Sequence, residues 1–502
     1  MNTSLTAHQL VGLLVDPGSF VSWDEPPTAE PADAGYRASL ARARERTGTD
    51  EAVLTGAGRI GGEPAALVAS EFGFLGGSIG VATAERITRA VERATAERLP
   101  LVALPVSGGT RMQEGSAAFL CMLRITAAVQ AHRAAGLPYL TYLRNPTMGG
   151  VFASWGTLGQ LVFAEPGARL GFLGPRVYEE LRGVPLPTEV QRAETLAERG
   201  LVDAVVAPEE LREVLRRSLS VLTRVPLPAP PAAAAPIVPA PTAERPDAWE
   251  AVLRTRRADR PGTRELLRRT TGELVLLDSP GGRSGALVRA LAVLDGQPAV
   301  VVGQQRQCGA QELPFTAADL RAVRRTARFA EQLGLPLVTV VDTAGAELSV
   351  QAELEGIAVE IAHCLTTLLS LRTPVLAVLL GQGSGGGALA LLPADRVLAA
   401  SNAWLAPLPP EGASAIVHRD GSHAPELARS QGIGAYDLAA VGLVDEVVPE
   451  LPDAADEPAA FCTRLGHAVS TALAHLTATP APTRLTARTT RHRRLGDLLT
   501  RS

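Results

Sequence analysis

The chain has 502 residues, of which 48 are basic and 52 acidic, giving a net formal charge of −4, and 46% are hydrophobic. This length predicts two or more domains with sizeable cores, and the near-neutral charge gives no reason to expect binding to nucleic acid or to a membrane surface. The sequence contains no lysine, so all the basic residues are arginine. This absence excludes a pyridoxal-phosphate Schiff base, a Walker P-loop and covalently attached biotin or lipoate, because each of them needs a lysine amine.

The four cysteines, Cys121, Cys308, Cys364 and Cys462, stand singly in the sequence. Without a CxxC pair, neither a zinc ribbon nor a disulfide framework is expected, and the pattern is typical of a reducing compartment. The first twenty residues lack the basic start and apolar core of a secretory signal, and no apolar run is long enough to span a membrane. We therefore expect a cytoplasmic protein without a metal or a membrane segment.

In chain order, a segment rich in proline and alanine at 225–246 separates two halves of similar length and predicts a semi-rigid spacer. We expect one domain at 1–224 and another at 247–502. In both domains short apolar runs alternate with helical stretches, which predicts an α/β fold. The expected strands are Pro100–Leu104, Tyr139–Leu143 and Gln160–Ala164 in the first domain, and Ala299–Val302, Leu337–Val341 and Val375–Leu380 in the second.

The two halves resemble each other in the order of their segments. A strand that runs into glycines at Leu99–Thr110 has a counterpart at Leu335–Gly345. Further along, PTMGGVF at 146–152 parallels GQGSGGGAL at 381–389, and GLVDAVV at 200–206 parallels GLVDEVV at 442–448. A duplicated domain is the simplest interpretation.

Each half thus carries two glycine-rich turns directly after strands. Glycine accepts positive φ and lets a ligand approach the backbone, so N–H groups of two such turns can converge on one oxygen. The pattern predicts an oxyanion hole made of main chain in each half, which would stabilise charge that develops in a transition state. The alternative, that the glycines only form tight turns, is weaker because the same pair occurs twice.

Other motif interpretations fit less well. The GxGxxG spacing of Gly381, Gly383 and Gly386 lacks the acidic residue expected about twenty positions later in a dinucleotide site. Ser384 resembles a nucleophile elbow, but Gln382 stands where that motif needs glycine. We expect His418 and Cys308, which have no catalytic partner nearby in sequence, to be a packing or surface histidine and an inert thiol.

Several motifs resemble carboxyltransferase subunits of multi-subunit acetyl-CoA carboxylase. PVSGGTRMQEGS, RNPTMGGVFAS and AEPGARLGFLGPRVYEEL resemble the β-subunit, whereas AEQLGLPLVTVVDTAGA, GQGSGGGALALLPADRVL and PLPPEGASAIVHRD resemble the α-subunit. The chain is similar to a β–α fusion over roughly 14–210 and 260–450. The resemblance implies two tandem crotonase-like domains, each an α/β fold of the ββα superhelix type.

The resemblance also implies a reaction and a set of residues. The first half would hold acyl-CoA and the second carboxybiotin, facing each other across a domain interface. Carboxybiotin would release CO₂, the freed biotin nitrogen would take the α-proton of the thioester, and the enolate would capture the CO₂. By motif position, N–H groups near Gly108, Gly109, Gly149 and Gly150 would hold the thioester enolate oxygen, those near Gly345, Ala346, Gly386 and Gly387 the biotin urea oxygen, and Arg111, Gly76 and Gly77 would contact substrate.

The partners implied are an acyl-CoA, with acetyl-CoA as the default and a malonyl-CoA-type product, a biotin carboxyl carrier protein and a biotin carboxylase. Because the chain has no lysine, biotin must arrive on the separate carrier. Arginine would meet the phosphates of coenzyme A, for which its bidentate geometry is suited. By the same resemblance we expect a homo-oligomer.

Two features depart from the resembled family. Nothing before Cys121 forms the four-cysteine zinc ribbon of many β-subunits, so zinc is not expected. The turn DTAGAELS replaces the usual DTPGAYPG, and Ala344, Glu347 and Ser349 stand at altered places; Glu347 adds a negative charge beside the proposed biotin-side hole. Two alternatives therefore remain: a malonyl-thioester decarboxylase that needs no biotin, and a non-catalytic scaffold.

Overall fold

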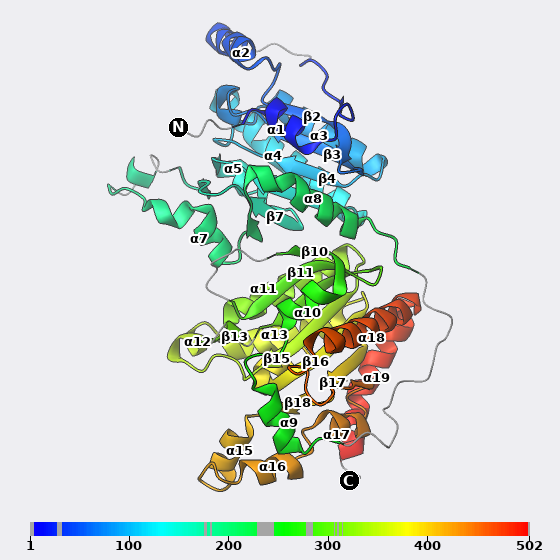
Figure 1. Cartoon of the computed structure of the whole chain (residues 1–502). Coiled ribbons are helices and arrows are strands. Elements are labelled where there is room, and N and C mark those ends of the chain that lie inside the picture. The colour runs from blue at the N-terminus through cyan, green and yellow to red at the C-terminus, as the bar shows by residue number, and fades with distance from the viewer. Residues whose placement is uncertain are drawn as a thin grey trace. The chain divides into compact units, whose positions relative to one another are not determined.

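The structure, a computed structural model, describes residues 5–27, 33–174, 178–180, 183–227, 245–277, 285–305, 307–308, 311–313 and 315–499. The chain divides into two compact units. The first unit holds 1–220 with 278–282, and the second holds 221–277 with 283–502. Figure 1 shows both, with the first unit in blue to green and the second in green to red.

The first unit is built on a seven-stranded sheet in the order β1-β2-β3-β4-β5-β7-β9. Strands β2 and β3 form an antiparallel hairpin, and every later pair in the sheet is parallel, with helices as crossovers. The strands are β1 Val21–Ser22, β2 Val53–Ile60, β3 Glu63–Ser70, β4 Leu101–Leu104, β5 Tyr139–Leu143, β7 Leu161–Ala164 and β9 Ala204–Val205, and the short pair β6 Thr147–Met148 and β8 Leu170–Gly171 lies beside this sheet.

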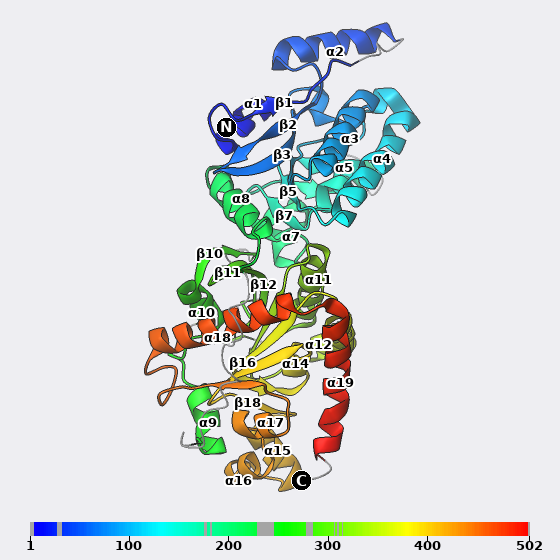
Figure 2. The same ribbon diagram turned by 90° about the vertical axis from the view of Figure 1, so that its right-hand side faces the viewer.

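Two long helices of the first unit, α3 (Val81–Ala96) and α4 (Gly115–Ala134), pack against each other, as Figure 2 shows. Their apolar residues recur at helical spacing, for example Ile87 and Val91 in α3, and are buried in one core with the strands. The remaining helices are α1 Ala7–Leu14, α2 Ala34–Thr47, α5 Gly149–Phe152, α7 Ala193–Glu198 and α8 Pro208–Leu222.

The second unit repeats this plan in a sheet of order β10-β11-β12-β15-β16-β17-β19, with β18 paired to the end of β16. Its leading strands are again antiparallel and its later ones parallel. The strands are β10 Thr271–Leu276, β11 Leu287–Leu294, β12 Gln297–Gln304, β15 Leu337–Thr343, β16 Val375–Ser384, β17 Arg396–Ala400, β18 Trp404–Ala406 and β19 Glu446–Val448, with the separate pair β13 Gln307–Cys308 and β14 Gln311–Glu312.

Helices cover this second sheet. The long helix α18 (Pro458–Ala478) contacts strands β11, β12, β16 and β17, and α19 (Ala481–Leu499) follows it. The others are α9 Ala248–Thr255, α10 Thr263–Thr270, α11 Ala317–Gln332, α12 Val350–Leu354, α13 Ile357–Ser370, α14 Gly385–Leu389, α15 Pro410–Val417, α16 Ala424–Ser430 and α17 Ala435–Ala440. The α/β class and the internal repeat expected from the sequence are therefore present.

A buried arginine, Arg488, holds helix α19 against the rest of the second unit. The Arg488 side chain is 1% exposed and forms a bidentate ion pair with Asp395, at 2.7 and 2.9 Å. It also donates to the carbonyl oxygens of Leu368 and Leu371, at the C-terminal end of α13, where the last carbonyls lack helical donors. One guanidinium therefore holds α19, α13 and the loop before β17 together.

We predict that Arg488→Ala lowers the free energy of unfolding of the second unit by about 3–5 kcal/mol, because it leaves Asp395 buried without its cation. The matched control is Arg429→Ala, whose ion pair with Asp247 is largely exposed and is worth less than about 1 kcal/mol. Urea unfolding followed by circular dichroism measures both variants. Equal losses in the two variants would contradict this account of α19.

Candidate functional site

In the first unit the two glycine turns lie against each other. The turn after β4 forms an isolated parallel bridge between Ser107 and Thr147, and the Met148 N–H donates to the Ser107 carbonyl oxygen. A Cβ atom placed on Gly109 would lie 3.8 Å from the backbone nitrogen of Gly150. Segments some forty residues apart in sequence thus form one backbone surface.

The backbone donors of this surface divide into two groups. The Gly108 N–H donates to the Gly76 carbonyl oxygen at 2.9 Å, and the Gly109 N–H donates to Ser107 Oγ at 3.0 Å. In contrast, the first N–H groups of α5, those of Gly149 and Gly150, have no acceptor within a helix. The parallel pairing of β6 with β8, in which Met148 lies opposite Gly171, takes up the Gly149 N–H, whereas no loop or side-chain acceptor in the described ranges receives the N–H of Gly150 or Thr110.

The second unit has the same arrangement at the ends of β15 and β16. The Gly345 N–H donates to Thr343 Oγ1 at 3.1 Å, and the Thr343 hydroxyl donates to the Gly345 carbonyl oxygen at 2.9 Å. Helix α14 begins at Gly385, whose φ of +61° favours glycine. The parallel pairing of β16 with β18, in which Ser384 lies opposite Ala406, takes up the Gly385 N–H, whereas no loop or side-chain acceptor among the residues that the structure covers receives the N–H of Ala346 or Gly386.

The two sites match at a constant distance along the chain. Thr343 lies 236 positions after Ser107, and both residues bridge the glycine two positions later in the same way. The same interval relates Ile79 to Phe315, Gly109 to Gly345, Thr110 to Ala346, Thr147 to Gly383, Gly149 to Gly385 and Gly150 to Gly386. Serine or threonine two positions before the turn glycine was the sequence signal that could have revealed this register.

This register shows how the glycine pairs named from the motifs correspond between the two units. The second-unit pairs Gly345–Ala346 and Gly386–Gly387 are equivalent to Gly109–Thr110 and Gly150–Val151, one residue further along than the first-unit pairs named from the motifs. Gly387 is special to the second unit: a Cβ there would lie 2.9 Å from the Ala346 nitrogen, whereas its counterpart Val151 is accommodated in the first unit.

A buried glutamine supports the second-unit site. Gln304, at the end of β12, donates through Nε2 to the Gly387 carbonyl oxygen at 2.8 Å and accepts the Asp342 N–H at 3.2 Å. It therefore links α14 to the strand that precedes the other turn. Sequence reasoning missed Gln304 because the link joins positions far apart in the chain.

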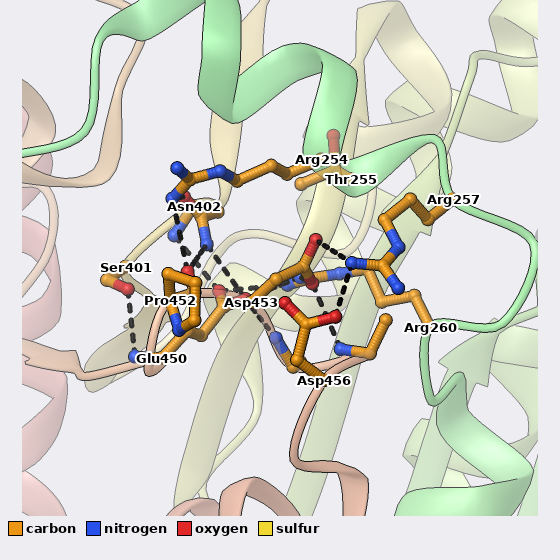
Figure 3. A network of polar contacts seen from close by, with 12 residues as sticks. Arg254, Thr255, Arg257, Arg260, Ser401, Asn402, Glu450, Pro452, Asp453 and Asp456 are labelled. Atoms are coloured by element: carbon orange, nitrogen blue, oxygen red, sulfur yellow. Dashed lines mark hydrogen bonds and ion pairs between the residues drawn. The ribbon is translucent and has the colours of Figure 1, made fainter.

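A second anchor of β16 is the polar network in Figure 3. Arg260 donates to the Leu380 carbonyl oxygen at 3.0 Å, to Glu450 at 2.9 Å and to Asp453 at 2.8 Å, and Asn402 also donates to Glu450. These hydrogen bonds hold the pKa of the Glu450 carboxyl below its usual range, although burial acts in the opposite direction. The network fixes β16 a few residues before its glycine turn.

Arg111, expected to contact substrate, instead lies inside the first unit. Its side chain is 1% exposed and pairs with the equally buried Glu51, at 2.6 and 3.2 Å. The guanidinium is bound by Glu51, by the Ser78 carbonyl oxygen and by Thr83 Oγ1, so it holds the backbone around it. Gly76 and Gly77, the other two expected contacts, pack against the turn: a Cβ on Gly77 would lie 2.1 Å from the Val106 carbonyl oxygen.

The altered turn DTAGAELS keeps its backbone geometry. The Glu347 N–H donates to the Phe315 carbonyl oxygen at 2.9 Å, as the Arg111 N–H does to Ile79 in the first unit. The Glu347 carboxylate accepts a hydrogen bond from the Ser349 hydroxyl at 2.9 Å and is half-buried. The same backbone position thus carries a buried cation in one unit and a partly exposed anion in the other.

The first unit also contains a cavity of about 850 Å³. It lies between α2, α3 and the start of α4, and its lining includes Trp23, Tyr36, Arg86, Arg111 and Glu114. Its cationic side chains have acidic partners, such as Asp50 for Arg86. The cavity lies on the Arg111 side of the turn, apart from the free N–H groups.

Other candidate groups have no catalytic setting. His418 stacks on His423 in an exposed loop, and burial raises the pKa of the Cys364 and Cys462 thiols to about 12 and 11. The described parts of the chain contain no group of three or more histidine, cysteine, aspartate or glutamate residues arranged for a metal ion. No helix within these ranges is long and apolar enough to cross a membrane.

Comparisons with known proteins agree with this architecture. A model of the carboxyl transferase domain matches residues 2–486. A probable biotin-dependent acyl-coenzyme A carboxylase beta3 subunit of Mycobacterium tuberculosis is 56% identical over 98% of this chain and 99% of its own length. A protein of Salinispora tropica named acetyl-coenzyme A carboxylase carboxyl transferase subunits beta/alpha is 40% identical over 99% of this chain and 91% of its own length.

Among solved structures, the transcarboxylase 12S hexamer with methylmalonyl-coenzyme A bound aligns with a TM-score of 0.73 and 20% identity. The alignment covers 94% of this chain and 89% of that one. It confirms two tandem crotonase-like α/β domains. With a family model that spans nearly the whole sequence, the chain belongs to the carboxyl transferase domain family.

Proposed function

We propose that the chain is a biotin-dependent acyl-CoA carboxyltransferase that moves a carboxyl group from carboxybiotin on a carrier protein to acetyl-CoA or another acyl-CoA. The observation that supports it most is the matched pair of glycine-turn sites, each with backbone N–H groups free for a ligand. The names of two relatives, a biotin-dependent acyl-CoA carboxylase subunit and a fused beta/alpha carboxyltransferase, agree with it. The first unit would correspond to the β part and the second to the α part.

In the first unit, the N–H groups of Thr110 and Gly150 would hold the thioester oxygen as the α-carbon loses its proton. Donors fixed by the fold stabilise the enolate without reorganising, which is where main-chain holes contribute most. Removing one such donor typically costs about 2.7–4 kcal/mol of transition-state stabilisation. Gly109 would leave room for the thioester beside them, because its missing side chain opens the surface between the two turns.

In the second unit, the N–H groups of Ala346 and Gly386 would hold the urea oxygen of biotin. The donor set fits that group, since a urea carbonyl accepts hydrogen bonds and needs no charged partner. Biotin supplies the carboxyl group on one ring nitrogen, and that nitrogen accepts the α-proton of the thioester after the carboxyl group leaves. Gln304 and Arg260 would keep α14 and β16 in place during the transfer.

The partners follow from the same proposal. A separate biotin carboxyl carrier protein and a biotin carboxylase would supply carboxybiotin, because the chain has no lysine to carry biotin itself. Single cysteines without a disulfide framework support a cytoplasmic location. A malonyl-thioester decarboxylase is the second candidate, favoured by the negative charge of Glu347 beside the proposed biotin site.

The reverse reaction separates these candidates. We predict that the purified chain converts malonyl-CoA to acetyl-CoA only when free biotin or biotinylated carrier is present, because the freed carboxyl group needs an acceptor nitrogen. Acetyl-CoA is quantified by chromatography with and without biotin. Equal turnover without biotin would favour the decarboxylase, and no turnover with any short or long malonyl-type thioester would favour a scaffold.

Glycine substitutions distinguish the two sites. We predict that Gly387→Ala lowers biotin-dependent turnover at least about tenfold, because its Cβ would displace the Ala346 nitrogen and misplacement by about 1 Å can cost roughly 100-fold. Gly150→Ala, whose Cβ would meet only side-chain atoms at 3.3–3.8 Å, should cost less than Gly150→Val. Steady-state kinetics against malonyl-CoA and biotin measures each variant.

Two glycines in open space serve as controls for these variants. A Cβ on Gly12 in the first unit or on Gly421 in the second would meet nothing within 4 Å. Their alanine variants should keep wild-type turnover. If Gly387→Ala behaved like Gly421→Ala, the close approach of the second-unit turns would have no role in the reaction.

Both units carry an exposed apolar face next to their glycine turns. Met112 is 81% exposed and Leu123 69%, and their equivalents Leu348 and Val359 are 96% and 56% exposed. Faces of this kind mark interaction surfaces in soluble proteins. We propose that a second copy of this chain covers them, which agrees with the hexamer named for transcarboxylase 12S.

We predict that Leu123→Glu reduces the oligomeric state, because an added carboxylate would have to be buried without a partner. Sedimentation analysis measures the mass of the assembly, and thermal unfolding checks that the chain still folds. Leu201→Glu, at a position of similar exposure in the same unit, is the control and should leave the mass unchanged. An unchanged mass for Leu123→Glu would contradict the proposed interface.

A further inference from the structure

The first-unit turn ends in a side chain that points into the protein. Arg111 follows Thr110 directly, and its N–H is fixed by the Ile79 carbonyl oxygen at 2.9 Å. Its side chain is 1% exposed, so the guanidinium lies beneath the turn. The position of the Thr110 N–H therefore depends on where this buried group is held.

Protein groups surround the guanidinium. Nη1 and Nη2 form a bidentate pair with Glu51, and Nη2 also donates to the Ser78 carbonyl oxygen at 2.9 Å and to Thr83 Oγ1 at 3.1 Å. Glu51 is itself held by the Thr83 hydroxyl and by the Ala52 N–H, at 2.9 and 2.8 Å. A planar guanidinium bound on two sides has one orientation, which a lysine ammonium could not reproduce.

A second layer joins helix α2 to this ion pair. Arg111 Nη1 donates to the Tyr36 hydroxyl at 3.3 Å, and that hydroxyl donates to the Glu114 carboxylate. Glu114 also accepts the Val81 N–H at 2.5 Å, at the start of α3. Gly80 leaves space for these groups, since a Cβ there would lie 2.4 Å from Glu114 and 2.8 Å from the guanidinium.

Tyr36 remains a neutral donor through the physiological range. Burial and the hydrogen bond to Glu114 raise the pKa of Tyr36 to about 12. The helix that carries it begins with the Asp33 cap and packs Leu40 and Ala43 against Phe74. The Tyr36 hydroxyl thus connects helix α2 to Arg111 at the end of the glycine turn, more than sixty residues later in the chain.

Within the residues that the structure describes, the second unit has no equivalent of this arrangement. Glu347 occupies the position of Arg111, is half-buried and accepts a hydrogen bond from Ser349. The second-unit turn is held by Gln304 and Arg260, which act on α14 and β16. The buried pair of Arg111 and Glu51 therefore acts on the first-unit site alone.

We propose that Arg111 and Glu51, together with Tyr36 and Glu114, are positioning residues of the acyl-side site and set the place of the Thr110 N–H and the glycine turn. The inference rests on the proposed function and adds helix α2 to the acyl-side machinery. A group that acts only through a backbone donor should change the rate of the chemical step more than the binding of either substrate.

The test compares Arg111→Lys and Tyr36→Phe with two matched controls in the biotin-dependent conversion of malonyl-CoA to acetyl-CoA. Arg86→Lys removes an arginine that is 8% exposed and pairs with Asp50. Tyr142→Phe removes a buried phenol that donates to the Val206 carbonyl oxygen. Neither control residue contacts Arg111 or the turn in the hydrogen bonds of the described chain.

We expect Arg111→Lys to lower kcat at least about tenfold and Tyr36→Phe about threefold, with both KM values within about threefold of wild type. Arg86→Lys and Tyr142→Phe should keep kcat within about twofold, even where thermal unfolding shows a comparable loss of stability. A kcat for Arg111→Lys and Tyr36→Phe that equals that of the controls would overturn the inference. If Arg111→Lys does not fold, Tyr36→Phe against Tyr142→Phe decides alone.

The same assay separates failure of the inference from failure of the proposed function. A wild-type chain that converts malonyl-CoA only with biotin supports the function, and the four variants then test the positioning role. A wild-type chain without biotin-dependent turnover would overturn the proposed function and, with it, the acyl-side role of Arg111.

Discussion

In each unit, the candidate site depends on the close approach of two backbone turns, which have glycine at the point where they meet. In the second unit the distance is short enough that a single methyl group on Gly387 would lie 2.9 Å from the Ala346 nitrogen. Backbone N–H groups can then serve a ligand from a rigid frame, because strands β15 and β16 end side by side and start the turns there. The parallel sheet, the crossover helices and the buried anchors keep these strand ends in register.

Duplication provides two such frames, and sequence divergence has given them different surroundings. The positions of the free donors are the same at an interval of 236 residues, but Arg111 of the first unit corresponds to Glu347 of the second, and Val151 corresponds to Gly387. The first-unit turn is held by the buried ion pair of Arg111 and Glu51. The second-unit site is held by Gln304, which binds α14, and by Arg260, which binds β16. The two sites therefore have equivalent backbone N–H donors but different neighbouring side chains, as expected if each site binds a different substrate.

Local pattern was enough to predict the α/β class, the repeat and the glycine turns, because strand periodicity and Gly-Gly steps are visible over short stretches. It was not enough to align the two sites residue by residue, since the hydrogen bonds of Ser107 and Thr343 define that register. Arg111 was expected to meet substrate by its place in the motif; its burial depends on Glu51, sixty residues away. Gln304 was missed for the same reason, as its side-chain partners come from strand β15 and helix α14, far along the chain.

The assignment of one substrate to each unit can be tested most directly by amide hydrogen exchange followed by mass spectrometry, with an acyl-CoA or with biotin added separately. The account predicts that acyl-CoA slows exchange in peptides that contain Thr110 or Gly150, whereas biotin slows it in peptides that contain Ala346 or Gly386. Protection of the same unit by both ligands, or of neither set of turns, would contradict it.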